Sequence, residues 1–299
     1  MLRKLNMGTS KLQNPRETGR TCTFCGSTNF RLLHEWGPEH PRNSASITVG
    51  FWECECKLAF LDPIPTPQQL PSNGDWWSPQ RKQVRRNPTL KEMRVNFQNY
   101  LFGTAQSRLI QQTRKLVPTG RLLDIGCGTG QLLETARPYF QCHGLEPSEF
   151  AAQQAREKGF RIIQATLEDA ALEPDDRFAV VTLDAVLEHL FDPVETLARI
   201  NRLMPMGGVV VIKVPKLWGP THHSFGREWN GFRVGYHTIM FSGQTLGNVL
   251  RATGFEPTSN PRRDRPLDDI LILWGRKVAE MPVDPEVLVR TIARRRNAA

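Results

Sequence analysis

The sequence predicts an α/β protein with a doubly wound, mostly parallel sheet, and two observations support this prediction. Between residues 118 and 277, short apolar segments alternate with amphipathic ones, a pattern typical of parallel strands with helices on both faces. Within that region, the apolar segment 121–125 runs directly into a glycine-rich turn and then a helical pattern. A chain of 299 residues, 39% of them hydrophobic, can form this domain and a smaller second one.

Apolar periodicity and breaker residues divide the chain into elements and zones. The expected strands are 121–125, 141–145, 161–164, 178–184, 209–214 and 270–274. The expected helices are 131–137, 149–158, 194–203 and 246–253, each closed by a nearby Gly or Pro, with another helix from about 90 to 116. The zones are a disordered basic tail (1–20), a cysteine-bearing segment (21–63), a linker, lid and helical segment (64–117), the main domain (118–277) and a C-terminal extension (278–299).

Composition and charge restrict the location and the partners. The longest strongly apolar run, 207–214, contains Lys213 and is too short to cross a bilayer. The N-terminus lacks the apolar stretch of a secretory signal, so we expect a cytoplasmic protein. The net charge is +9, and residues 1–110 carry 15 Lys and Arg against 8 Asp and Glu. This excess favours an anionic partner or substrate, although a solubilising surface is the alternative.

The turn after the strand at 121–125 contains glycines at alternate positions, Gly126, Gly128 and Gly130, and Asp124 stands just before it. Glycine is needed where a backbone turns sharply or lies against a ligand. A dinucleotide fingerprint requires a glycine where Gln131 stands, and the Gly-Lys-Ser/Thr of a phosphate-binding loop is absent. The loop therefore suits a cofactor without a pyrophosphate, or it is only a glycine-rich turn.

A second carboxylate follows the next expected strand. Glu146 stands 16 residues after Gly130, where the strand 141–145 ends. Neighbouring parallel strands end at one edge of the sheet, so a carboxylate there can accept hydrogen bonds from both ribose hydroxyls of a nucleoside. The glycine loop and Glu146 together predict a nucleoside-containing ligand.

Three segments carry a resemblance to a known family: 122–130 with Glu146, the strand 178–184, and Glu188-His189-Leu190 after it. They resemble class I S-adenosylmethionine-dependent methyltransferases, in the small-molecule branch of ubiquinone-type, sugar and natural-product enzymes. The resemblance covers about residues 118–277. It implies a Rossmann-like sheet of seven strands with a final antiparallel strand, and S-adenosylmethionine bound over the strand ends.

The same resemblance implies the cofactor-binding residues. By this resemblance, the glycine loop would lie against the methionine part of the cofactor with Asp124 nearby, and Glu146 would bind the ribose. Leu167 and Glu168 would flank the adenine, and Asp184 would lie beside the methyl group. The full implied set is Asp124, Gly126, Cys127, Gly128, Gly130, Glu146, Leu167, Glu168 and Asp184. Where the family usually has Phe-Asp, this chain has Phe178-Ala179, a departure that affects a local contact.

Four early cysteines form two close pairs, Cys22 with Cys25 and Cys54 with Cys56. Two thiolate pairs on tight turns can form a tetrahedral zinc site, and this segment resembles the zinc-binding segment that precedes some methyltransferase domains of this branch. The second pair is one residue tighter than C-x2-C, so His34 or His40 is a substitute ligand. The alternative is four unligated packing residues.

Two histidines are candidate bases, because an oxygen or nitrogen acceptor must lose its proton during methyl transfer. His189 follows the strand 178–184, and His237 follows an aromatic loop, 216–235, whose composition suits a partly apolar acceptor pocket. The structural alternatives are that His189 orients the following turn and that the aromatic loop is core.

The sequence therefore predicts a methyltransferase that acts on a small or medium-sized acceptor of sugar, lipid-quinone or natural-product type. One alternative is an RNA methyltransferase, with phosphates contacted by Arg81, Lys82, Arg85 and Arg86. Another is a non-catalytic zinc-ribbon scaffold. The identity of the acceptor, the accepting atom and the oligomeric state do not follow from the sequence.

Overall fold

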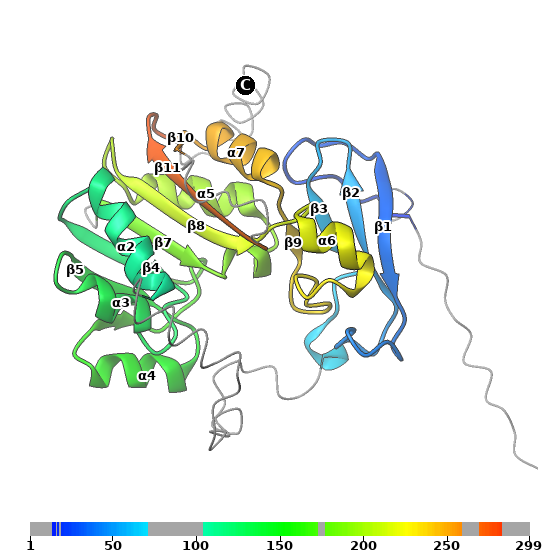
Figure 1. The fold of residues 1–299 in the computed structure, drawn as a ribbon, viewed down its shortest axis with the longest axis horizontal. Helices are drawn as coiled ribbons and strands as arrows, with labels where there is room; N and C mark the ends of the chain where they lie inside the picture. Colours follow the sequence, from blue (N-terminus) through cyan, green and yellow to red (C-terminus); the bar gives the residue numbers. More distant parts are fainter. Residues whose placement is uncertain are drawn as a thin grey trace, which may run out of the picture.

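Two β-sheets organise the protein, as a computed structural model that describes residues 14–15, 17, 19–70, 104–172, 177–258 and 269–282 shows (Figure 1). The larger sheet has seven strands, in the spatial order β10 (Phe255–Thr258), β11 (Ile270–Lys277), β8 (Val209–Pro215), β7 (Val180–Asp184), β4 (Arg121–Ile125), β5 (Gln141–Leu145) and β6 (Arg161–Ile163). Strands β8, β7, β4, β5 and β6 pair in parallel, and β11 is antiparallel to both of its neighbours. The predicted α/β class and the final antiparallel strand are confirmed.

Helices cover both faces of the larger sheet. One face packs against α2 (Ala105–Leu116) and α3 (Gln131–Ala136), and the other packs against α5 (Pro193–Arg202) and α7 (Gly243–Ala252). The helix α4 (Glu149–Glu157) connects β5 to β6. Successive strand residues alternate between the two cores: Leu122 is in the first and Leu123 in the second. The central strands are therefore apolar on both sides, as doubly covered parallel strands are.

The smaller sheet joins two distant parts of the chain. Its strands, all antiparallel, are β1 (Phe30–Trp36), β2 (Val49–Cys54), β3 (Ala59–Asp62) and β9 (Ile239–Met240). In the register of β3 with β9, Ala59 lies opposite Met240 and Phe60 opposite Ile239. The backbone N–H of Leu61 also donates to the carbonyl of Thr238 at 2.8 Å. The cysteine-bearing segment thus forms its sheet together with a strand of the main domain.

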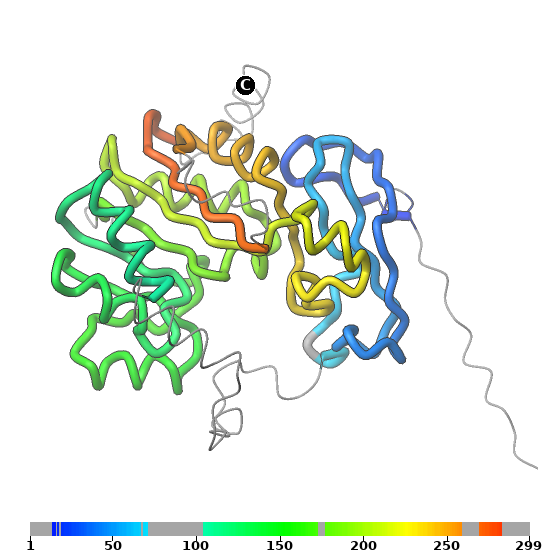
Figure 2. The backbone as a smooth tube through the Cα atoms, in the orientation of Figure 1, coloured from blue at the N-terminus to red at the C-terminus, as the bar shows by residue number. Residues whose placement is uncertain are grey.

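The aromatic loop after β8 packs on the smaller sheet. It contains α6 (Pro220–Phe225), and in Figure 2 this yellow part of the chain lies beside the blue strands. Trp229 and Phe232 are buried and share a core cluster with Trp36 and Phe51. The ring centroids of Trp36 and Phe232 are 5.2 Å apart. These two loop aromatics are therefore core residues, which was the structural alternative. Among the described residues, no helix has the length and apolarity needed to cross a membrane.

Candidate active site

The glycine loop lies at the carboxyl end of β4, directly before α3. Gly126, Gly128 and Gly130 all have positive φ angles, of 68°, 53° and 81°. A Cβ on Gly126 would come within 2.6 Å of a methyl carbon of Val186, so both its backbone conformation and its surroundings require glycine. The N–H groups of Gly126 and Cys127 donate to the carbonyl of Leu145 at 2.7 and 3.1 Å. The loop is thereby bound to the end of β5.

Glu146 holds the loop from the neighbouring strand. Its side chain is buried, and one carboxylate oxygen accepts from the Gly128 N–H at 2.8 Å. The other oxygen accepts from the Ser148 N–H at 2.9 Å. The Glu146 carboxylate therefore fastens the glycine loop to the segment that follows β5. Glu146 is thus positioned where the sequence predicts the ribose contact.

Two more carboxylates lie near the same strand ends. Asp124 is buried in β4 and accepts a hydrogen bond from the Thr182 hydroxyl at 2.6 Å. Burial, with smaller contributions from the charges of Asp184 and Glu146, raises the pKa of Asp124 to about 7, although the Thr182 hydrogen bond lowers it. Asp184, the last residue of β7, accepts from the Lys213 ammonium at 2.6 Å. This concentration of carboxylates favours a cationic ligand.

The remaining predicted cofactor residues differ in exposure. Leu167 is buried in the main core, and the Glu168 side chain is exposed while its carbonyl accepts from Arg199 at 3.2 Å. Burial raises the pKa of the Cys127 thiol, with help from Asp124 and Glu146, so this cysteine is a poor nucleophile. The adenine contacts of Leu167 and Glu168 stay predictions.

The two candidate bases lie together. The ring centroids of His189 and His237 are 4.7 Å apart, although 48 residues separate them in the chain. The Nδ1 of His189 is 3.0 Å from the carbonyl oxygen of Tyr236, and that of His237 is 2.8 Å from the carbonyl oxygen of Gly231. Burial lowers the pKa of both rings, for His237 to about 3, so both are neutral at neutral pH.

The four early cysteines also converge. The sulfurs of Cys22 and Cys56 are 3.7 Å apart, those of Cys25 and Cys54 are 3.3 Å apart, and all four lie within 4.8 Å of one another. Zinc–sulfur bonds of about 2.3 Å in a tetrahedron place sulfurs about 3.8 Å apart. The four sulfurs therefore fit one zinc ion despite the tight second pair. Neither proposed substitute is among them, because His34 contacts His222 and His40 contacts Glu228.

Comparison with known proteins identifies the family. A family described as methyltransferase domain matches residues 97–260, which is more than half of the 299 residues. The chain belongs to this methyltransferase domain family. Ubiquinone biosynthesis O-methyltransferases are among its curated relatives. The protein of Alkalilimnicola ehrlichii is 30% identical over 145 residues, which cover 46% of this chain and 53% of the relative. That of Caulobacter sp. is 31% identical over 163 residues, covering 51% and 62%.

The chain thus spans about half the length of the curated relatives it matches. Two solved structures are also similar to it. One is a 1,6-didemethyltoxoflavin N1-methyltransferase of Burkholderia thailandensis, with a TM-score of 0.45 and 20% identity, covering 62% of this chain and 83% of that one. The other is a sugar N-methyltransferase of Streptoalloteichus, with a TM-score of 0.44 and 17% identity, covering 66% and 96%.

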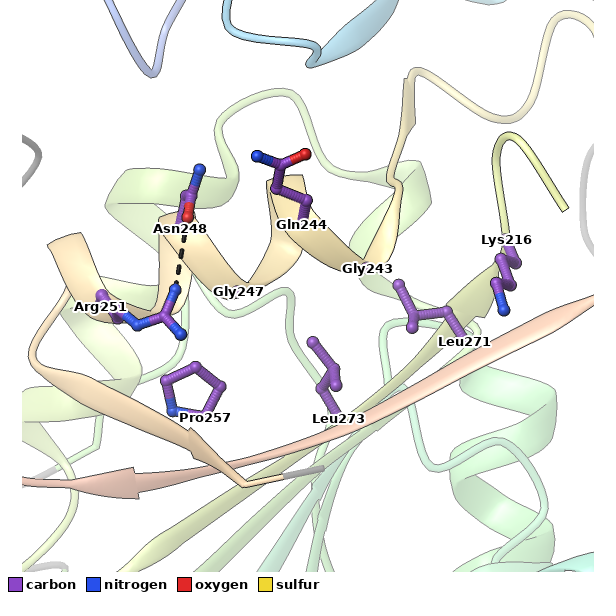
Figure 3. Close-up of a pocket in the computed structure, with 9 residues that line it drawn as sticks. All are labelled: Lys216, Gly243, Gln244, Gly247, Asn248, Arg251, Pro257, Leu271 and Leu273. Carbon is purple, nitrogen blue, oxygen red and sulfur yellow. Dashed lines mark hydrogen bonds between the residues drawn. The ribbon is translucent and has the colours of Figure 1, made fainter. Parts of the chain in front are cut away.

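A cavity of about 420 Å³ also lies in the methyltransferase domain, between α7 and the strands β10 and β11 (Figure 3). Lys216 and Arg251 line its two ends, and Arg251 donates to the Asn248 side chain at 3.3 Å. The other lining residues are Gly243, Gln244, Gly247, Pro257, Leu271 and Leu273. None of them is a predicted cofactor, catalytic or metal residue.

Three polar residues that contact the candidate site residues were not predicted from the sequence as part of the site. Thr182 binds Asp124, and Lys213 binds Asp184, each across neighbouring strands. Glu188 is buried beside His189 and His237, and a carboxylate oxygen and one nitrogen of each ring lie within 4.8 Å of one another. For Glu188 and Lys213 a signal was available, since each is a charged residue within or beside an apolar element.

Proposed function

We propose that this protein transfers the methyl group of S-adenosylmethionine to a small or medium-sized acceptor. The observation that carries the proposal is the buried Glu146 carboxylate, which accepts from Gly128 in the glycine loop and from Ser148 at the start of α4. Family membership supports it. The curated relatives named as ubiquinone biosynthesis O-methyltransferases favour an oxygen acceptor of sugar, lipid-quinone or natural-product type.

In this proposal the cofactor-binding residues have separate roles. Gly126, Gly128 and Gly130 allow the methionine part to lie against the loop, Glu146 accepts from the ribose hydroxyls, and Leu167 and Glu168 flank the adenine. The bound cofactor supplies an electrophilic methyl group on a positively charged sulfur. Asp124 and Asp184 favour that charge, which disappears when the methyl group leaves. The site is therefore expected to bind the methylated cofactor more tightly than the demethylated product.

On the acceptor side, His189 and His237 would act on the proton of the acceptor. Each ring has one nitrogen against a backbone carbonyl, which can only accept, so that nitrogen carries the proton of the neutral ring. In this proposal the other nitrogen takes the proton from a hydroxyl or amine of the bound acceptor. Alignment of acceptor and donor and exclusion of water supply the rest of the rate enhancement.

We also propose that the four cysteines hold a structural zinc ion. Ligation by Cys22, Cys25, Cys54 and Cys56 leaves no open position for chemistry, so the ion would stabilise the turns before β1 and β3. Reduced thiols are required, which is consistent with the cytoplasmic location that we propose.

Calorimetric titration with S-adenosylmethionine tests the proposed function, followed by an acceptor screen with methyl-labelled cofactor. We expect binding and label transfer to a small molecule. Absence of cofactor binding by folded protein would overturn the proposal, and label transfer to RNA alone would favour the RNA alternative. The basic residues 81–86 on which that alternative depends lie outside the described residues, and no contact in the described part of the chain favours a scaffold role.

A further inference from the structure

Glu188 is a buried carboxylate for which the proposed methyl transfer, as described so far, has no use. Its exposed fraction is 1%, and its Oε2 has no hydrogen-bond partner among the described residues. A buried polar atom without a partner is costly, and a native structure that retains one requires a reason. The reason must come from the groups that surround Glu188.

The backbone holds Glu188 beside both candidate bases. Glu188 and His189 belong to one 3-10 turn, Leu187–His189, that follows β7. The carbonyl of Glu188 accepts from the N–H of Thr238 at 2.8 Å and from its hydroxyl at 3.2 Å, and Thr238 directly follows His237. Two separate segments are therefore fastened together at this point. The spacing of the three side chains follows from backbone bonds and does not depend on their own ionisation.

The Glu188 carboxylate lies beside both imidazole rings. A carboxylate oxygen of Glu188 and one nitrogen of each ring lie within 4.8 Å of one another. In the neutral rings the Nδ1 of His189 and of His237 carries the proton that its backbone carbonyl accepts. A further proton on either ring would make it an imidazolium, and the buried Glu188 carboxylate beside it would stabilise that charge.

We propose that Glu188 shares the proton that His237 or His189 removes from the acceptor, and so acts as a positioning residue for that proton. When the methyl group is transferred to an acceptor hydroxyl, the O–H bond breaks and a ring N–H bond forms. The electron pair of the oxygen forms the new bond to carbon, and the carbon–sulfur pair stays on sulfur. The proton remains on the histidine–glutamate group until it passes to water, with the carboxylate balancing the imidazolium charge.

The titration properties of the groups support this role. Burial lowers the pKa of His237 to about 3, so the ring alone would hold a proton poorly. Burial, with a smaller contribution from nearby Asp184, raises the pKa of Glu188 to about 7 against the lowering effects of its own backbone N–H, Lys213 and Arg233. A carboxylate that titrates near neutrality can receive and release a proton at physiological pH.

The test measures proton sharing directly. The chain has only 7 histidines, so ring signals of protein labelled with 15N and 13C in histidine can be assigned and followed with pH by NMR. In the wild type, the signals of His189 and His237 should show a step near pH 7. In Glu188→Gln that step should disappear or move by at least one pH unit, whereas it should persist in Glu195→Gln, a control that removes an exposed carboxylate of α5.

Unchanged ring titrations in folded Glu188→Gln would overturn the proposal. If that variant does not fold, 13C-labelled glutamate in the wild type replaces it: coincident midpoints for Glu188 and the rings support sharing, and separate midpoints overturn it. Ring signals that shift on addition of Mg²⁺ or Zn²⁺ in the wild type but not in Glu188→Gln would also overturn it, because the group would then hold an ion. The catalytic role of Glu188 rests on the proposed function, but the titration itself needs neither cofactor nor acceptor. A failure of cofactor binding is therefore distinguishable from a failure of proton sharing.

Discussion

The two sides of the candidate active site are built in different ways. On the cofactor side, the glycine loop, Asp124 and Glu146 come from one continuous stretch, β4 to the start of α4, and the two carboxylates bind backbone N–H groups or the Thr182 side chain of the neighbouring β7. The acceptor side comes from two separate segments, and its polar groups are neutral imidazoles beside Glu188. The first side is local and charged, whereas the second depends on long-range contacts and on buried neutral groups.

This difference suggests that the two sides fail separately. Substitutions on the cofactor side should change affinity for the cofactor, and substitutions on the acceptor side should change turnover. The smaller sheet is joined to the acceptor side, because β9 begins two positions after His237 and the Leu61 N–H donates to the Thr238 carbonyl.

The largest expected effect is on turnover. His237→Gln should reduce kcat by about 10²–10⁴-fold with an acceptor from the screen, because a proton acceptor is lost. Cofactor affinity, measured by calorimetry, should stay nearly unchanged. His189→Gln is the matched variant, and the larger loss of kcat identifies the base. Normal turnover in both variants would show that the acceptor is already ionised or that another group removes its proton.

The next effect is on cofactor affinity. Glu146→Gln should weaken S-adenosylmethionine binding by about 1.5–3 kcal/mol, roughly 10–150-fold, through loss of charged hydrogen bonds. Glu149→Gln removes an exposed carboxylate three residues away and should leave the affinity unchanged. Calorimetric titration of both variants measures the difference. Equal affinities for wild type and Glu146→Gln would mean that Glu146 only holds the loop.

A smaller effect concerns stability and pH. The pKa of Asp124 is about 7 in the folded protein, against about 3.9 in the unfolded chain. Between these values the folded state binds more protons, so this group makes stability fall as pH rises from about 4 to 7. Asp124→Asn should lessen that fall by up to about 4 kcal/mol.

Urea unfolding at several pH values measures this contribution. Glu188 titrates in the same range, so the informative quantity is the difference between wild type and Asp124→Asn. If the free energy of unfolding depends on pH in the same way in the two proteins, the raised pKa of Asp124 is contradicted.

The smallest expected change in cofactor affinity comes from the cysteine cluster. Cys22→Ser should lower zinc content from about one ion per chain, measured by elemental analysis, and increase hydrogen exchange in β3 and β9. Cofactor affinity should change by no more than about twofold, because the ligands contact neither the glycine loop nor Glu146. Cys142→Ser, outside the cluster, is the control. No zinc in wild type purified without chelators would leave the cysteines as packing residues.

Local patterns explain why so much of the larger sheet could be predicted. Its central strands are mostly apolar, and the helices that follow β5 and β7 have side-chain N-caps, so short windows of sequence contain the signal. The same reasoning places α7 three residues too late, at 246, although Ser242 caps it by accepting from the Thr245 N–H at 3.1 Å. Ser242 is an N-cap residue, so the sequence already contained the signal for the start of α7. The expected helix from residue 90 is described only from Ala105, and its earlier part lies outside the described residues.

The acceptor side could not be predicted in the same way. Strand β9 has two residues, too few for any periodicity, and its partner β3 lies far upstream. The proximity of His189 and His237 depends on the Thr238 bonds to Glu188, which no window of sequence contains. Similarly, the aromatic residues Trp229 and Phe232 suited a pocket by composition, but the smaller sheet supplies the surface that buries them.

The pairing of β3 with β9 has a consequence for the order of events during synthesis. From Asp62 to Ile239 the ribosome must add 177 residues, which takes about 9–35 s at typical rates. Until then β3 has an unpaired edge, and the nascent N-terminal strands lack their fourth partner. All four cysteines are already made by residue 56, so a metal ion can hold their turns together throughout this interval. Bound zinc would thus keep the first three strands of the smaller sheet ordered while the edge of β3 awaits β9.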